Sequence, residues 1–219
     1  MKKIKVLVAC EFSGIVRDSF KDEDFDVISC DLEDTERPGN HYKGDMFDII
    51  GNGFDVLLAF PPCTYLSSAG LHHEVVRSYE QRPAALGRVY QRKKAVEFFL
   101  RIWNYPIKYK CLENPAGYIS SRILKPSQII HPYYFGSVHK KRTCLWLDNL
   151  PLLQYEYERN LFSPDFIKPV IKPLSVDASG KNRFYTDFNR TQRKRSTFHL
   201  EVAQAMANQW KPFLREKLL

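Results

Sequence analysis

A thiol that directly follows two prolines is the residue best placed to do chemistry in this chain. The apolar run 54–60 predicts a strand buried on both faces of a parallel sheet. Pro61 and Pro62 end that strand, because neither can donate a hydrogen bond to a neighbouring strand. In an open α/β sheet the stiff loop that follows faces the ligand crevice, so Cys63 is a candidate nucleophile. The alternative is a small apolar residue that fills the loop.

A carboxylate after another predicted strand could face that thiol. The run 108–112 predicts a strand, and Glu113, Asn114 and Pro115 follow it. If this strand lies beside the one that delivers Cys63, Glu113 lies across the same crevice. There it could hold the amine and ring nitrogen of a pyrimidine and share a proton with the ring. The alternative is a strand-end residue that bonds to the local backbone.

Turns after the first two predicted strands could hold a nucleoside. A strand over 5–10 leads into the turn 11–14 and a helix over 15–20, and the glycine of this turn would let a ligand approach the backbone. A second strand over 25–30 ends in Asp31, where a Rossmann-like fold holds a ribose by its hydroxyls. The alternative for Asp31 is the start of a solvated acidic loop.

A short loop follows the second predicted strand. It contains Gly44 and Asp45. The Asp45 carboxylate could meet an adenine amino group. The alternative is a helix cap, a role that aspartate serves well.

Three basic segments could contact a polyanion. Residues 72–92 interleave arginines with tyrosines, which suits a surface that follows a phosphate backbone and stacks on bases. The basic segment 139–142, called the basic lip below, precedes a predicted strand over 143–147 and could bind a phosphate or support Glu113. The run 190–195 is consistent with contact to backbone phosphates. The alternative for each segment is solvated surface, which is the commoner case for a segment such as 72–92.

Length and composition predict one α/β domain with a small appendage. The chain has 219 residues, 44% of them hydrophobic, which is enough for one substantial core. We expect residues 1–147 to form the catalytic and cofactor-binding core, with a crossover helix from Lys93. Residues 148–194 should form a reduced, loop-rich substrate region with at most a small hairpin, and 195–219 a helix that packs back on the core.

Charge and cysteine content restrict the partners and the compartment. The net charge of +8 favours a nucleic acid or nucleotide. The five cysteines are odd in number and widely spread, which indicates reduced thiols in a cytoplasm. The sequence contains no CxxC pair of the kind that binds zinc, so no metal site is expected. The start of the chain runs straight into a strand, which is too short for a signal peptide, and no apolar run approaches the length that crosses a membrane.

The order of these motifs resembles that of the cytosine-5 DNA methyltransferases, and closely that of their short phage-type members. Phe12-Ser13-Gly14 is similar to the Phe-x-Gly of their first motif. Asp31 and Gly44-Asp45 are similar to their ribose-binding acid and adenine-binding Gly-Asp. The resemblance implies a Rossmann-like fold with a mainly parallel sheet that binds S-adenosyl-methionine. The implied cofactor contacts are Phe12, Ser13, Gly14, Asp31, Asp45 and Pro61.

The catalytic part of the resemblance lies in three further motifs. The segment 60–70 is similar to the family's Pro-Cys-Gln-x-Phe-Ser-x-Ala-Gly, Glu113-Asn114-Pro115 to Glu-Asn-Val, and Lys140-x-Arg142 to Gln-x-Arg-x-Arg. It implies that Cys63 adds to carbon 6 of a flipped-out cytosine, that Glu113 protonates or holds N3, and that carbon 5 takes the methyl group. Arg142 is the third implied catalytic residue. The implied substrate contacts are Pro62, Ser67, Asn114, Lys140, Arg193 and Arg195.

Departures from the family pattern leave the substrate open. Thr64 and Val138 stand where the family has glutamines, and Lys140 stands for an arginine. Fewer than about fifty residues follow the strand that contains Trp146 before the last basic run, too few for an independent target-recognition domain. The stretch 195–210 could replace the family's last helix. The alternatives are RNA or a free pyrimidine nucleotide as substrate, a partner protein that supplies specificity, or a catalytically silent nucleic-acid-binding relative.

Overall fold

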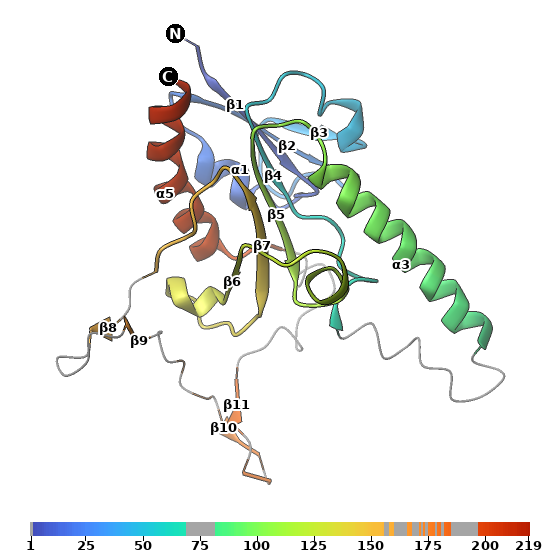
Figure 1. The fold of residues 1–219 in the computed structure, drawn as a ribbon. Coiled ribbons are helices and arrows are strands. Elements are labelled where there is room, and N and C mark those ends of the chain that lie inside the picture. The colour runs from blue at the N-terminus through green and yellow to red at the C-terminus, as the bar shows by residue number, and fades with distance from the viewer. Residues whose placement is uncertain are drawn as a thin grey trace.

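A seven-stranded sheet forms the centre of the protein (Figure 1). The computed structural model describes residues 2–68, 82–155, 158–159, 166–167, 171, 173, 175–177, 179–180, 182–184 and 197–219. The strands are β1 (Ile4–Ala9), β2 (Phe25–Asp31), β3 (His41–Lys43), β4 (Val56–Ala59), β5 (Tyr109–Pro115), β6 (Gln128–Ile130) and β7 (Thr143–Asp148).

The strand order is β3-β2-β1-β4-β5-β7-β6. Strands β1 to β5 run parallel to one another, whereas β7 is antiparallel to both of its neighbours, β5 and β6. A mostly parallel sheet with one reversed strand in this order is typical of the Rossmann-like methyltransferase fold. The predicted fold class is therefore confirmed.

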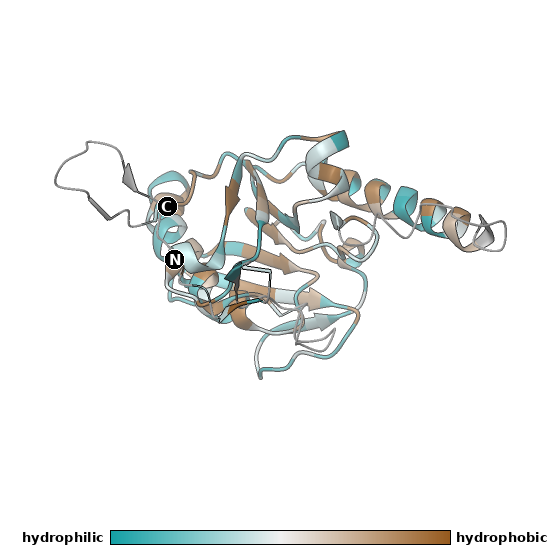
Figure 2. Ribbon diagram, turned by 90° about the horizontal axis from the view of Figure 1, so that it is seen from below, coloured by the Kyte–Doolittle hydropathy of each residue, from teal (hydrophilic) through white to brown (hydrophobic). Residues whose placement is uncertain are grey.

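Helices cover both faces of the sheet, which explains why its strands are almost continuously apolar. Alternate residues of β1 enter two different cores: Val6 and Val8 pack with α1 (Ile15–Phe20) and α5 (Leu200–Leu218) on one face. Leu7 and Ala9 enter the other core with α3 (Arg82–Trp103). Figure 1 shows α1 and α5 on one side of the sheet and α3 on the other, and Figure 2 shows the hydrophobic strands between them.

Helix α3 begins at Arg82, well before the start near Lys93 that the apolar spacing predicts. Its C-terminal part supplies Phe99 and Ile102 to the core, and there the helical period is visible in the sequence. Its N-terminal part projects away from the sheet in both ribbon views. Leu86 and Tyr90 are exposed in that part, so no buried stripe marks it.

Strand β5 is longer than predicted. It continues through Glu113 and Asn114 to Pro115, because its antiparallel pairing with β7 extends to the pair Pro115 and Thr143. Glu113 therefore lies within the sheet opposite Leu145, and its backbone position is fixed by the strand. A prediction from apolar residues alone ends the strand too early, since these polar residues are paired by a neighbour that is distant in sequence.

Short elements complete the described part of the chain. A helical turn, η1 (Met46–Asp48), follows β3, and two further turns are η4 (Ile119–Ile123) and η5 (Pro132–Phe135). Two small antiparallel pairs follow β7: β8 (Glu158–Arg159) with β9 (Phe166–Ile167), and β10 (Ser175–Val176) with β11 (Asn182–Arg183).

Some predictions fall on residues that the structure does not describe. Arg193 and Arg195, and the part of the basic segment before Arg82, lie outside the described residues. The three-part division of the chain stays a prediction. None of the helices in the described ranges has both the length and the apolar character needed to cross a membrane.

Candidate active site

The carboxyl ends of four parallel strands meet at one edge of the sheet, where several predicted site residues gather. Ala9 of β1 pairs with Ala59 of β4, and Ala59 pairs with Leu112 of β5. The segments that leave these strands therefore start side by side. Because β7 runs in the opposite direction, the basic residues before Thr143 reach the same edge. This is the edge where open α/β sheets bind ligands.

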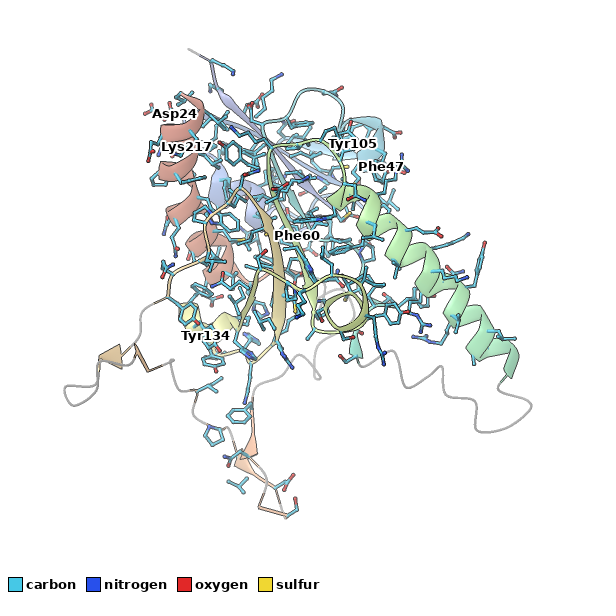
Figure 3. All side chains as sticks on the ribbon, viewed as in Figure 1. Asp24, Phe47, Phe60, Tyr105, Tyr134 and Lys217 are labelled. Atoms are coloured by element: carbon cyan, nitrogen blue, oxygen red, sulfur yellow. The ribbon has the colours of Figure 1, made fainter. Side chains whose placement is uncertain are left out.

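A cleft of about 240 Å³ opens at this edge and brings Cys63 and Glu113 together. Cys63 is half-buried and Glu113 is 7% exposed. Phe60, which Figure 3 labels near the middle of the molecule, also lines this cleft. The other described lining residues are Cys10, Glu11, Phe12, Ser13, Asp31, Glu33, Pro61, Pro62, Thr64, Thr197 and Phe198.

A second cavity of about 130 Å³ adjoins the cleft. The two share Cys10, Asp31 and Pro62. The far wall combines apolar side chains with one carboxylate, in a form suited to a flat heterocycle that carries an amino group. Its described residues are Cys30, Leu32, Gly44, Asp45, Met46 and Phe98.

The turn after β1 is built around Gly14. Gly14 has φ +72, and a Cβ there would lie 2.7 Å from a guanidinium nitrogen of Arg17, so only glycine fits without strain. The turn places Phe12 and Ser13 in the lining of the cleft. Gly14 itself does not line the cleft but starts α1.

The loop that carries Cys63 is fixed at both ends. On the C-terminal side of the loop, the carbonyl oxygen of Cys63 accepts hydrogen bonds from the backbone N–H of Leu66 at 3.0 Å and of Ser67 at 2.9 Å. These two bonds form a tight turn. Before Cys63, the side-chain amide of Asn114 donates to the carbonyl oxygen of Pro61 at 2.7 Å. Asn114 and Ser67, both predicted to contact substrate, hold this loop and do not line the cleft.

Burial raises the pKa of the Glu113 carboxyl, and the positive charge of Lys141 partly offsets this rise. Its Oε1 is buried and has no hydrogen-bond partner in the described part of the chain. Of the basic residues that the resemblance selects, Arg142 is exposed, and the amino group of Lys140 lies 3.9 Å from the centre of the Phe184 ring. Lys141, which lies between them in the sequence, is the basic residue whose charge lowers the pKa of Glu113.

The two carboxylates predicted to hold a nucleoside are already oriented by backbone groups. Asp31 Oδ1 accepts from the N–H of Glu33 at 3.0 Å, and burial raises the pKa of Asp31. Asp45 Oδ1 accepts from the N–H of Phe47 at 2.9 Å and so caps η1. Asp45 thus serves as a cap and also lines the second cavity.

No family model matches this sequence, and no curated protein matches it. Among solved structures, the methyltransferase EhMeth of Entamoeba histolytica is similar. The identity is 13% and the TM-score 0.47, over 78% of this chain and 58% of the other. The chain thus spans less than two thirds of that methyltransferase. At this distance the similarity identifies neither an activity nor a substrate.

The cleft is lined by acidic side chains, although the chain as a whole is basic. Its described lining contains four carboxyl groups, from Glu11, Asp31, Glu33 and Glu113, and no lysine, arginine or histidine. The chain as a whole carries +8. A ligand bound inside the cleft should therefore be neutral or cationic, and phosphate groups should stay at its rim.

Sequence reasoning missed several residues of this site, among them Glu11, Lys141, Thr197 and Phe198. Glu11 had a signal, because an acidic residue directly after a strand at a ligand-binding edge is a candidate site residue. Lys141 lies between Lys140 and Arg142, the two residues that the family resemblance selects, and so was passed over. Thr197 and Phe198 had no local signal: they reach the cleft from the segment before α5, where the Phe198 ring lies 4.7 Å from the Phe60 ring between centroids.

Proposed function

We propose that the protein transfers a methyl group from S-adenosyl-methionine to carbon 5 of cytosine in DNA, through a covalent adduct with Cys63. The observation that carries this proposal is that Cys63 and Glu113 line one cleft, which adjoins a second cavity suited to a nucleoside. A nucleophile and a carboxyl group that keeps its proton, facing one flat ring, are what methylation of a pyrimidine carbon requires.

The residues present fit S-adenosyl-methionine. Asp31 lies where the two cavities join and could hold the ribose hydroxyls, while Asp45 could accept from the adenine amino group. Phe12, Ser13 and Pro61 line the cleft that Asp31 joins to the second cavity. When bound, this cofactor supplies an electrophilic methyl group on a positively charged sulfur. The acidic lining complements that charge.

Cys63 and Glu113 would have complementary roles: Cys63 would add to the ring as a nucleophile, and Glu113 would limit the negative charge that this addition creates. Carbon 5 of cytosine is a weak nucleophile until the Cys63 thiolate forms a bond to carbon 6. Glu113 would hold a proton at N3. The ring of the adduct would then not carry a full negative charge from the electron pair that this addition displaces. Carbon 5 then becomes nucleophilic. After methylation, loss of the carbon 5 proton to solvent expels the Cys63 thiolate from carbon 6 and restores the ring.

DNA is the proposed substrate because the chain is basic while the cleft is not. A base flipped out of a strand would bring an uncharged ring into the acidic cleft and leave its phosphates at the rim. The net charge of +8 and the predicted phosphate contacts at Lys140, Arg193 and Arg195 favour a polyanion there. Specificity for a site within DNA would then need a further contact or a partner protein.

Trapping with 5-fluorocytosine tests this proposal. The fluorine at carbon 5 cannot leave as a proton does, so the adduct should persist after denaturation. DNA, RNA and a free nucleotide that carry this base are each incubated with the protein and S-adenosyl-methionine. We expect an adduct with DNA that maps to Cys63 by mass spectrometry.

Each other outcome has a defined meaning. An adduct with RNA or the nucleotide alone would change the substrate. Cys63→Ser should form no adduct while it still binds S-adenosyl-homocysteine in calorimetry, and a variant that still methylates would exclude the covalent mechanism. If the wild-type protein binds DNA and cofactor but forms no adduct with any of the three substrates, the covalent reaction is excluded and a role in binding nucleic acid without catalysis is favoured.

A further inference from the structure

Glu11 is a buried carboxylate with one oxygen engaged and the other without a partner. It follows β1 directly, lines the cleft and is only 4% exposed. Its Oε1 accepts hydrogen bonds from the N–H of Ile15 at 3.1 Å and from the hydroxyl of Ser13. Its Oε2 is buried and makes no hydrogen bond within the described part of the chain.

Capping α1 does not account for this residue. One oxygen is enough to accept from the first N–H of the helix and from Ser13. The second oxygen is then buried without a hydrogen bond that would compensate for its lost hydration. Burial accordingly raises the pKa of Glu11, and the hydrogen bonds from Ser13 and Ile15 and the charge of Arg17 offset this rise only in part. A buried oxygen of this kind at the wall of a cleft indicates a donor that arrives with a ligand.

The backbone beside Glu11 supports the same interpretation. Cys10 has φ 57, a left-handed conformation that residues other than glycine rarely adopt. Cys10 lines both cavities and Glu11 lines the cleft. Strained backbone conformations persist chiefly at functional sites, where the surrounding structure holds them.

We propose that Glu11 binds the α-ammonium group of S-adenosyl-methionine through Oε2, an inference that rests on the function proposed above. An ammonium group supplies both a positive charge and three N–H donors, so it meets the two needs of a buried carboxylate oxygen. The positively charged sulfur has no N–H to donate. Two of the other carboxyl groups of the cleft have different partners in the proposed function: Asp31 accepts from the backbone and adjoins the second cavity, and Glu113 would face the pyrimidine beside Cys63.

Calorimetry with three probes separates these roles. S-adenosyl-methionine carries the ammonium group and the charged sulfur, S-adenosyl-homocysteine carries only the ammonium group, and 5′-methylthioadenosine carries neither. Glu11→Gln keeps an oxygen for Ile15 and Ser13 but replaces the second oxygen by an NH₂ group. We expect it to lose about 10- to 100-fold in affinity for the first two probes and to bind 5′-methylthioadenosine like the wild type.

The control is Glu23→Gln, the same substitution at an exposed position beyond the other end of α1, which should bind all three probes normally. Equal losses for all three probes in Glu11→Gln would assign Glu11 a structural role, and a loss for S-adenosyl-methionine alone would assign it to the sulfur. Unchanged binding would overturn the inference and leave the proposed function intact. A wild-type protein that binds neither S-adenosyl-methionine nor S-adenosyl-homocysteine would overturn the proposed function, and this inference with it.

A test on the wild type does not depend on the fold of a variant. S-adenosyl-homocysteine is compared with its analogue that lacks the α-amino group. We expect the amine to improve affinity by at least about 10-fold. Equal affinities would overturn the role of Glu11, because no ammonium would then be recognised.

Discussion

The side-chain amide of Asn114 donates to the carbonyl oxygen of Pro61 at 2.7 Å, and so ties β5 to the loop that carries Cys63. Asn114 directly follows Glu113 and is 1% exposed. One strand therefore fixes the candidate acid and, through this hydrogen bond, the candidate nucleophile. The loop needs such an anchor, because Pro61 and Pro62 have no N–H with which to join the sheet.

Asn114→Ala should weaken both the fold and the reaction. It leaves the buried carbonyl of Pro61 without a donor, which should lower the free energy of unfolding by about 1–3 kcal/mol. Because the loop is then less well held, adduct formation on 5-fluorocytosine should slow by about 100-fold. Urea denaturation and the rate of adduct formation measure the two effects.

Gln128→Ala is the matched control for Asn114. The Gln128 side chain also bonds to buried backbone, with the N–H and carbonyl oxygen of Leu153, but it lies on β6. It should lose comparable stability and keep the wild-type rate of adduct formation. If Asn114→Ala reacts as fast as Gln128→Ala, the bond to Pro61 is structural only.

Glu113 should give adduct formation a bell-shaped pH dependence. Cys63 must be deprotonated to attack and Glu113 must be protonated to hold a proton at N3, so the rate depends on the pKa values of both groups. Burial raises the pKa of Glu113, so the limb of the profile that Glu113 sets should lie above the pH at which an exposed glutamate titrates. Glu113→Gln should lose that limb and reduce the maximal rate by about 100- to 10,000-fold.

Lys141 should shift the position of the limb that Glu113 sets. Its positive charge lowers the pKa of Glu113 against the effect of burial, so Lys141→Met should move this limb to higher pH. Lys141→Arg keeps the charge and should restore the wild-type profile. Arg142→Met removes an exposed cation and should leave the profile in place. A shift with Arg142→Met and none with Lys141→Met would support the role that the family resemblance gives to Arg142.

Asp31→Asn should weaken cofactor binding without loss of the fold. The amide oxygen can still accept from the N–H of Glu33, but the charge that would hold ribose hydroxyls is lost. Calorimetry with S-adenosyl-homocysteine should show a loss of about 10-fold or more. Asp34→Asn, at a side chain that is 81% exposed and paired with Lys43, should bind normally. Equal affinities for wild type and Asp31→Asn would place the ribose elsewhere.

The sequence predicted the central strands well, because they are buried on both faces and leave continuous apolar runs. Strands β1, β2, β4 and β7 lie where these runs predict them, and the first two end at Cys10 and Asp31 to within a residue. The two prolines after β4 likewise placed Cys63 at the carboxyl edge of the sheet. These features are local, so a sequence can show them.

The rest depends on contacts between distant segments. The extension of β5 through Glu113 follows from its pairing with β7, and Phe198 reaches the cleft only because α5 packs against β1. Which residue of the basic lip acts on Glu113 depends on how the chain enters β7. Adjacent residues of an extended segment point to opposite sides, and the sequence does not show which side faces the cleft.

The raised pKa of Glu113 also predicts how stability changes with pH. A carboxyl whose pKa is higher in the folded than in the unfolded protein binds more protons in the folded state between these two values, so the free energy of unfolding falls as pH rises through that interval. Glu113→Gln cannot titrate and should remove this contribution. Relative to wild type, the variant should therefore gain stability as pH rises above the ordinary glutamate value, and the gain should level off above the raised one. Glu97→Gln, at an exposed position on α3, is the control and should show no such gain in urea denaturation across pH. A constant difference between Glu113→Gln and wild type would mean that Glu113 titrates like an exposed glutamate, which would also remove the reason to assign it the proton at N3.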